Sequence, residues 1–230
     1  MLPPEVIVFD VNETLSDLSP LAARFAEVGL SAETARLWFA SVLREGFALT
    51  AVGQPASFAG IGREVLRGLL VDAGAVPAEE SVEAVMAAFL DLDVHPDVAT
   101  GVRRLAAGGT RLVTLSNGAA AVAERLLDRA GLRESFEHVL SVDDAGIWKP
   151  AVGAYRYAAD VCGTTPDRML MVAVHPWDLH GAGLAGLRTA WVRRRSEEVY
   201  PSYFRTPDLA VSGVDDLAHL LAADPPPGPS

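Results

Sequence analysis

Residues 5–17 read EVIVFDVNETLSD, and within them a run of four apolar residues, Val6–Phe9, leads directly to an aspartate, Asp10. Apolar runs of this length with β-branched side chains are typical of a short buried strand. Asn12 stands two positions after the aspartate, and Thr14 two positions after that. The stretch therefore predicts a strand whose end carries one carboxylate, one amide and one hydroxyl.

In the remainder of the sequence further apolar runs alternate with helical segments. Four further runs predict strands, at 111–115, 138–141, 169–174 and 189–192. Segments with helical spacing lie around and between them, at 98–107, 119–130, 151–162 and 178–185. Strands that alternate with helices of this length predict an α/β fold with a mainly parallel sheet.

The stretch between the first strand and the rest has a different pattern. Helical spacing recurs there at 20–28, 32–44, 56–72 and 78–90, with no strand pattern. We expect an inserted helical bundle over the strand ends, which gives a core domain of residues 1–16 and 93–223 and a helical cap domain of residues 17–92. The last residues, 224–230, read DPPPGPS, a composition that predicts a disordered tail.

Composition excludes several classes of function. The chain has 230 residues, half of them hydrophobic, and a formal net charge of −11, which argues against nucleic-acid binding. No apolar stretch is long enough for a membrane span or a secretion signal. A single cysteine, Cys162, rules out an internal disulfide and is typical of a reducing compartment. We expect a cytoplasmic protein that does not bind membranes.

Polar residues that could carry chemistry follow four of the predicted strands. They are Asp10, Asn12 and Thr14, then Ser116 and Asn117, then Lys149, and finally His175, Trp177 and Asp178. Taken singly, such residues are often ordinary turn and helix-cap residues. In a parallel α/β sheet, however, the carboxyl ends of the strands meet at one crevice. We therefore expect these side chains to form one site.

Lys149 is the most informative of these residues. Of the 19 basic residues in the chain it is the one lysine, and all the others are arginine. An ammonium is a compact point charge, whereas a guanidinium is a planar fork. Retention of a lysine in a strand-end loop favours a functional role, although chance placement is the alternative.

The segments FDVNET, LSNG, WKP and VHPWD, in this order and spacing, resemble the four motifs of the haloacid dehalogenase superfamily. The helical block resembles that superfamily's cap domain, so the resemblance implies a Rossmann-like core with an inserted cap. The spacing from Lys149 to Tyr155, the Ser-Asn-Gly turn and the Trp-Asp pair before a helix are similar to one branch, the L-2-haloacid dehalogenases.

The resemblance also gives a chemical meaning to Asn12. Phosphatases of the superfamily carry a second aspartate there, which protonates an alkoxide leaving group. Halide is a weak base and leaves without a proton. In the fourth motif the phosphatases use two acids four residues apart to hold Mg²⁺, but four residues before Asp178 stands Val174, which cannot bind a cation. The resemblance thus implies no metal and no other cofactor, and assigns the main positive charge near Asp10 to Lys149.

The mechanism implied by the resemblance has two steps. Asp10 attacks C2 of a small (S)-2-haloacid and displaces halide, which inverts the carbon and leaves an aspartyl ester. Water, activated by Asp178, then hydrolyses the ester and releases the (R)-2-hydroxyacid.

The resemblance implies supporting roles for several other residues. Ser116, Asn117 and Thr14 hold the substrate carboxylate or the ester oxyanion. Tyr155 orients the lysine or the nucleophile, and Trp177 forms a wall of the pocket.

Three positions depart from the branch, all on the substrate or leaving-group side. Asn12 stands where the branch carries an aromatic residue. Phe39, after Leu37-Trp38, stands where an arginine receives the halide. His175 stands where the branch has an asparagine, and it either assists Asp178 as a base or serves as a hydrogen-bonding turn residue. The leaving group is therefore open.

Two other readings remain. The first is a phosphatase of the same superfamily that needs Mg²⁺ and acts on a small metabolite, against which Asn12 and Val174 argue. The second is a protein with this fold that binds a ligand without turnover, against which retention of Asp10, Lys149 and Asp178 argues. The sequence carries no specific signature for a homodimer, so the oligomeric state stays open.

Overall fold

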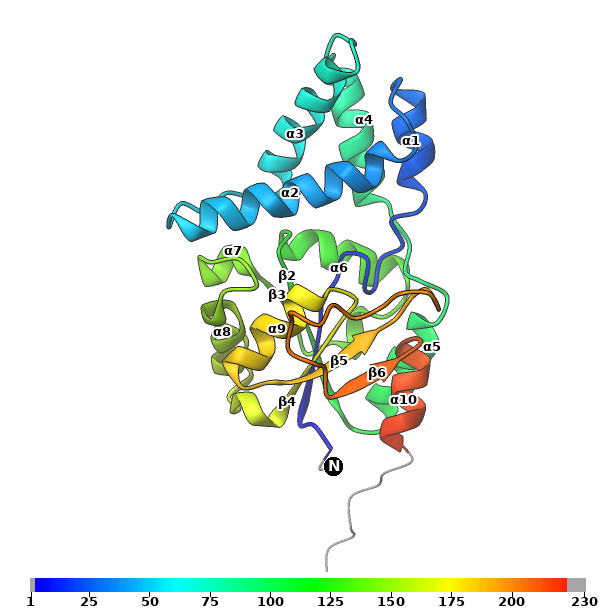
Figure 1. The fold of residues 1–230 in the computed structure, drawn as a ribbon. Helices are drawn as coiled ribbons and strands as arrows, with labels where there is room; N and C mark the ends of the chain where they lie inside the picture. The colour runs from blue at the N-terminus through cyan, green and yellow to red at the C-terminus, as the bar shows by residue number, and fades with distance from the viewer. Residues whose placement is uncertain (1–2, 223–230) are drawn as a thin grey trace, which may run out of the picture.

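The structure is a computed structural model that describes residues 3–222. Residue 223 and the predicted disordered tail, 224–230, lie outside the described residues. Within them a sheet flanked by helices carries a separate group of four helices at one end (Figure 1). None of the helices in residues 3–222 combines the length and apolar character that crossing a membrane requires.

The sheet has six strands in the order β3-β2-β1-β4-β5-β6, and every pairing is parallel. Its strands are β1 (Val6–Phe9), β2 (Arg111–Ser116), β3 (His138–Ser141), β4 (Met169–Ala173), β5 (Arg188–Val192) and β6 (Leu209–Val211). The prediction of an α/β fold with a mainly parallel sheet is confirmed. The quoted N-terminal run lies at the middle of the sheet, so the loops after β2 and β4 flank the loop after β1.

Helices cover both faces of the sheet. The core helices are α5 (Val98–Ala107), α6 (Ala120–Arg129), α7 (Val142–Ala145), α8 (Val152–Cys162), α9 (Pro176–Ala185) and α10 (Val214–Ala222). Alternate residues of β1 point to opposite faces: Val6 and Val8 pack with residues of α8 and α9, and Ile7 and Phe9 with residues of α5, α6 and α10. The run is apolar throughout because both of its faces are buried.

Four short elements and one longer helix have no counterpart in the predicted pattern. They are β6, α7, the 3₁₀ turns Arg133–Ser135 and Pro166–Arg168, and α10. The short ones hold three or four residues each, too few to establish a period. The helix α10 packs on α5 at Gly101, where an added Cβ would lie 2.6 Å from the backbone of Val214 and Asp215. A close approach of this kind depends on a partner distant in sequence.

The inserted helices lie together beyond the carboxyl ends of the strands, and α2 crosses over the core (Figure 1). They are α1 (Leu21–Glu27), α2 (Thr34–Ala51), α3 (Phe58–Asp72) and α4 (Glu79–Leu90). Trp38 is their centre: its ring packs against Phe25, Phe58 and Phe89, and its indole N–H donates to the Gly62 carbonyl at 2.8 Å. These four helices share one apolar core.

The two points where the chain enters and leaves this bundle lie side by side. The backbone N–H of Asp17 donates to the carbonyl of Asp93 at 2.9 Å, and Ser16 forms a β-bridge with Val94. This pairing supports the division of the chain that we propose, with a cap of residues 17–92 and a core made from the two flanking segments.

One core residue, Trp148, fastens the bundle to the sheet domain. Its side chain is buried, stacks on Phe58 of α3 and donates to the Ala56 carbonyl at 3.1 Å. Trp148 also contacts α2, where a Cβ added at Gly46 would lie 2.5 Å from Cε3 and 2.6 Å from Cη2 of the indole. Glycine is therefore required where α2 crosses the Trp148 ring.

We expect Gly46→Ala to destabilise the protein by about 1–3 kcal/mol, because the buried indole has no room to move away from the added methyl. Gly68→Ala in α3 is the matched control, since nothing lies within 4 Å of its added Cβ. That control should gain up to about 1 kcal/mol from the better helix former. Urea unfolding measures both changes, and equal effects of the two substitutions would contradict this role of Gly46.

Candidate active site

Four loops at the carboxyl end of the sheet bring ionisable and polar side chains together. Asp10 follows β1, Ser116 ends β2, Lys149 lies in the loop between α7 and α8, and Asp178 lies in the first turn of α9. All four are buried. The sequence-based expectation that these strand ends form one site agrees with this placement.

The centre of the site is the ammonium of Lys149. Its Nζ lies 2.9 Å from Oδ1 of Asp10 and 2.6 Å from Oδ2 of Asp178, and the lysine is fully buried. Burial alone would lower the pKa of Lys149, but the charges of the two carboxylates outweigh it and raise that pKa. The lysine is therefore a permanent cation shared by two acids.

Asp10 is held in its ionised form. Burial opposes ionisation, but the Lys149 ammonium, the nearby His175 and the Thr14 hydroxyl outweigh burial and lower the pKa of Asp10. The hydroxyl of Thr14 donates to Oδ2 of Asp10 at 2.6 Å and accepts from the backbone N–H of Val174 at 3.1 Å. A fixed, ionised carboxylate of this kind is suited to nucleophilic attack.

The pKa of Asp178 is shifted in the opposite direction, upward. Burial raises its pKa, the charge of Lys149 opposes this, and the charge of Asp10 adds to it. The hydroxyl of Tyr155 donates to Oδ1 of Asp178 at 2.6 Å and to the backbone carbonyl at 2.9 Å. A carboxylate with a raised pKa accepts a proton more readily, which suits a general base. The Tyr155 hydroxyl contacts this acid, so it orients the lysine only through Asp178.

Asn117 fixes the backbone of the lysine. Its Oδ1 accepts from the N–H of Lys149 at 3.0 Å, and its Nδ2 donates to the carbonyl of the same residue at 3.2 Å. Ser116 and Ser141 stabilise the neighbouring turn, because Gly118 donates its N–H to Oγ of Ser116 and accepts from Oγ of Ser141, both at 2.9 Å. We had expected Asn117 to hold substrate. Both ends of its amide are already used to position Lys149.

The residues do not fit the Mg²⁺ that related phosphatases use. The two carboxylates of the site share an ammonium, which fills the space where a hard cation would need oxygen ligands. Val174, at the position of the missing acid, offers no side-chain ligand, and its backbone is already used: its N–H donates to Thr14 and its carbonyl accepts from the Trp191 indole. Within residues 3–222 no cluster of three or more His, Cys, Asp or Glu side chains could hold a metal ion.

Aromatic rings cover the outer side of the site. His175 stacks on Trp177, with ring centroids 5.0 Å apart and an interplanar angle of 18°, and on Phe39 of α2, at 6.1 Å and 25°. Trp177 in turn meets Phe47 of α2 edge to face. Trp177, which the resemblance makes a wall residue, and Phe39, at the position of the branch's arginine, therefore both stack on the imidazole, and α2 contacts the site through Phe39 and Phe47.

The Nε2 atom of His175 points toward the nucleophile. It lies 3.2 Å from the carbonyl oxygen of Asn12 and 3.7 Å from Oδ2 of Asp10. A carbonyl only accepts hydrogen bonds, so Nε2 carries a hydrogen in this arrangement. The sequence alone did not distinguish a catalytic histidine from a turn residue. The structure places its N–H beside the nucleophile.

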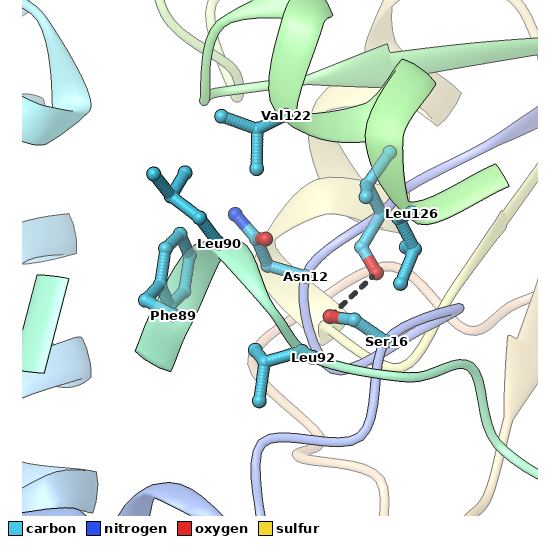
Figure 2. Close-up of a pocket in the computed structure, with 8 residues that line it drawn as sticks. Asn12, Ser16, Phe89, Leu90, Leu92, Val122 and Leu126 are labelled. Carbon is cyan, nitrogen blue, oxygen red and sulfur yellow. Dashed lines mark hydrogen bonds between the residues drawn. The ribbon is translucent and has the colours of Figure 1, made fainter. Parts of the chain in front are cut away.

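A small hollow opens next to Asn12 (Figure 2). Its cavity volume is about 10 Å³, and Figure 2 shows the Asn12 amide projecting among apolar side chains from α4 and α6. The lining residues are Val11, Asn12, Ser16, Phe89, Leu90, Leu92, Val122 and Leu126. A hollow of this size has room for about one water molecule, which the Asn12 amide could bind.

Glu13 is a residue of the site that sequence reasoning missed. It is the one non-glycine residue with positive φ, 62°, in residues 3–222, and its Oε2 lies 3.7 Å from Nε2 of His175. Burial raises the pKa of Glu13, while His175 opposes this and Asp10 adds to it. The only signal in the sequence was an acid inside the first motif, between Asn12 and Thr14.

Comparison with known proteins identifies the class. The family model for haloacid dehalogenase-like hydrolases matches residues 4–186. The chain belongs to this family, as the resemblance of its four motifs predicted. Among characterised relatives, (S)-2-haloacid dehalogenase H-109 of Pseudomonas putida is 30% identical over 96% of this chain and 99% of its own. (S)-2-haloacid dehalogenase 4A of Burkholderia cepacia is 31% identical over 94% of each chain.

Solved structures agree with this assignment. The L-2-haloacid dehalogenase of Xanthobacter autotrophicus with covalently bound chloropropionic acid superposes with a TM-score of 0.89 at 27% identity, over 96% of this chain and all of that one. Similarity over the whole length means that the core and the inserted helices are both shared. The predicted fold, a Rossmann-like core with a helical insertion, is therefore confirmed.

We expect Lys149→Met to destabilise the protein by about 3–5 kcal/mol near neutral pH, because two buried carboxylates lose their shared cation. Without the ammonium, both acids bind protons more tightly in the folded state than in the unfolded state. The stability deficit should therefore grow as the pH rises above about 4, the ordinary pKa of aspartate.

Urea unfolding at about pH 5 and about pH 8 measures this trend. The variant that combines Lys149→Met with Asp10→Asn and Asp178→Asn is the control, since it removes all three charges of the buried network. It should recover most of the lost stability. A deficit that is the same at both pH values would show that lost packing, not charge, is responsible.

Proposed function

We propose that this protein is a hydrolase that removes halide from a small (S)-2-haloacid and releases the (R)-2-hydroxyacid, without a metal or other cofactor. The observation that carries the proposal is the buried Lys149 ammonium shared by Asp10 and Asp178. It supplies an ionised nucleophile, a candidate base and a fixed positive charge within one hydrogen-bonded group. The relatives named above, at 30% and 31% identity, act on (S)-2-haloacids.

In the first step Oδ2 of Asp10 attacks C2 of the substrate, and the carbon–halogen bond breaks with its electron pair on the halide. Oδ2 is the oxygen on the accessible side, because Oδ1 faces Lys149, whose side chain is 0% exposed. Attack from behind inverts the carbon. Halide needs no proton, which explains why Asn12 can stand where a phosphatase carries an acid.

In the second step water attacks the ester carbonyl carbon of Asp10, and Asp178 takes a proton from it. Oδ1, now the ester carbonyl oxygen, gains negative charge and keeps the Lys149 ammonium as its partner. A preorganised cation at this oxygen acts as an oxyanion hole. The bond from the carbonyl carbon to Oδ2 then breaks, so Oδ2 leaves with the hydroxyacid and a water oxygen stays on Asp10.

The small-molecule substrate would lie between Asp10 and α2. We propose that Phe39 and Trp177 exclude water from this space and that Asn12 contacts the substrate, with Ser116 acting through the turn that it holds. A homodimer, left open by the sequence, stays a prediction.

We expect wild type to release halide from L-2-chloropropionate in the presence of EDTA, and Asp10→Asn to release none above background. The substitution keeps the size of the side chain and removes its negative charge, so it removes the nucleophile. Halide detection over time, with both proteins side by side, measures the effect. If wild type releases no halide but hydrolyses p-nitrophenyl phosphate once Mg²⁺ is added, the phosphatase reading replaces this one.

The two-step route also predicts where solvent oxygen goes. After one turnover in oxygen-18 water, with enzyme in excess over substrate, the label should be on Asp10 and absent from the product hydroxyl. Mass spectrometry of the peptide that contains Asp10 and of the product measures this. Label found in the product after that single turnover would mean that water attacks C2 directly, without an ester.

A further inference from the structure

The two sides of the nucleophile differ in their access to solvent. Lys149 and Asp178, on one side, have fully buried side chains. On the other side the side chains of His175 and Glu13 are 12% and 41% exposed. The proposed mechanism uses the buried side for the base and the oxyanion. It leaves the acid–base pair on the exposed side without a role.

The second step has a requirement that the first step lacks. When the ester breaks, the departing oxygen is an alkoxide, a strong base that leaves poorly without a proton. That oxygen is Oδ2 of Asp10, and the group nearest to it with a transferable proton on the accessible side is Nε2 of His175, at 3.7 Å. Thr14 also contacts Oδ2, but its hydroxyl is too weak an acid for this task.

We propose that His175 is the general acid of ester hydrolysis and that Glu13 is the positioning residue that holds its Nε2 beside Asp10, an inference that rests on the proposed function above. Nε2 gives its proton to Oδ2 as the carbonyl carbon–Oδ2 bond breaks, and the hydroxyacid leaves as a neutral alcohol. The proton that Asp178 took from water returns through solvent to His175. The regenerated Asp10 carboxyl loses one proton, so one proton is released per turnover in this step.

Two carboxylates and two aromatic rings hold His175 in place. Its Nε2 lies 3.7 Å from a carboxylate oxygen of Asp10 and of Glu13, and its ring stacks on Phe39 and Trp177. The stacked rings also hold the imidazole so that its nitrogen edge, and not its face, meets Asp10.

The backbone of Glu13 is evidence that its position matters. A non-glycine residue at φ 62° costs on the order of 1 kcal/mol or more and persists where the surrounding structure requires it. This conformation directs the carboxylate back toward His175 although Glu13 is only three residues after the nucleophile. The other charged groups that act on Glu13 are Arg36 of α2 and Arg195 after β5, and both favour its ionised form.

The test separates the two steps by rapid mixing with L-2-chloropropionate. In His175→Gln, which keeps an N–H donor near the place of Nε2 but has no proton to transfer, we expect halide release in the first turnover to stay within about threefold of wild type, while ester hydrolysis slows about 10²- to 10⁴-fold. The covalent ester on Asp10 should then accumulate and add the mass of the propionate group to that peptide. His138→Gln, in the edge strand β3, is the matched control and should behave as wild type.

Glu13→Gln tests the positioning role through the split between the two steps. The amide keeps the size of the side chain but loses the charge beside Nε2, so ester hydrolysis should slow about 10- to 10²-fold with the halide step unchanged. Glu13→Asp should recover part of the lost hydrolysis rate, and Glu45→Gln, a half-exposed acid of α2, is the matched control.

The outcomes are distinguishable. No halide from wild type would overturn the proposed function and this inference with it. A wild-type burst of halide, together with unchanged ester hydrolysis in His175→Gln, would overturn only the role of His175. An equal loss of both steps in His175→Gln would also overturn it, because an acid for alkoxide has no task in halide release. Unchanged ester hydrolysis in Glu13→Gln would overturn the role of Glu13.

Discussion

The ion pair network of Lys149 with Asp10 and Asp178 is the constraint on which the rest of the site depends. Two buried carboxylates next to each other would repel, and each would favour protonation. One ammonium between them keeps the nucleophile ionised and leaves Asp178 with a raised pKa, so a single cation produces two acids of different character. Such a network is stable only if its geometry is fixed, and Asn117 and Tyr155 fix it from two directions.

In the proposed mechanism the same network takes the place of the acid and the metal of related phosphatases. The cation that a metal would supply is part of the protein chain, and a first leaving group that needs no proton makes an acid at position 12 unnecessary. A proton is needed only in the second step, by Oδ2 on the exposed side of Asp10. There the structure places His175, which stands where the branch has an asparagine, and Glu13, which sequence reasoning missed.

Much of the fold could be predicted because its strands are buried on both faces. Runs such as Val6–Phe9 are apolar throughout and stand out without any partner being known. Lys149 could be singled out because the chain otherwise uses arginine. Strand β6 and helix α10 were not predicted from the sequence pattern, since one is three residues long and the other packs on α5 at Gly101. The role proposed for Glu13 depends on a positive φ and on a histidine 162 positions later, and neither is visible in local sequence.

The cap and the chemistry are joined at two adjacent points. Trp148, which fastens the helical bundle to the core, immediately precedes Lys149, so the loop that docks the cap also delivers the cation. The same cap helix, α2, meets Trp148 at Gly46 and His175 at Phe39. A displacement of α2 would therefore disturb both sides of the nucleophile, the lysine through its neighbour and the histidine through its stacking partner. The position of α2 on the core therefore determines the geometry of the lysine loop and of the stacked histidine together.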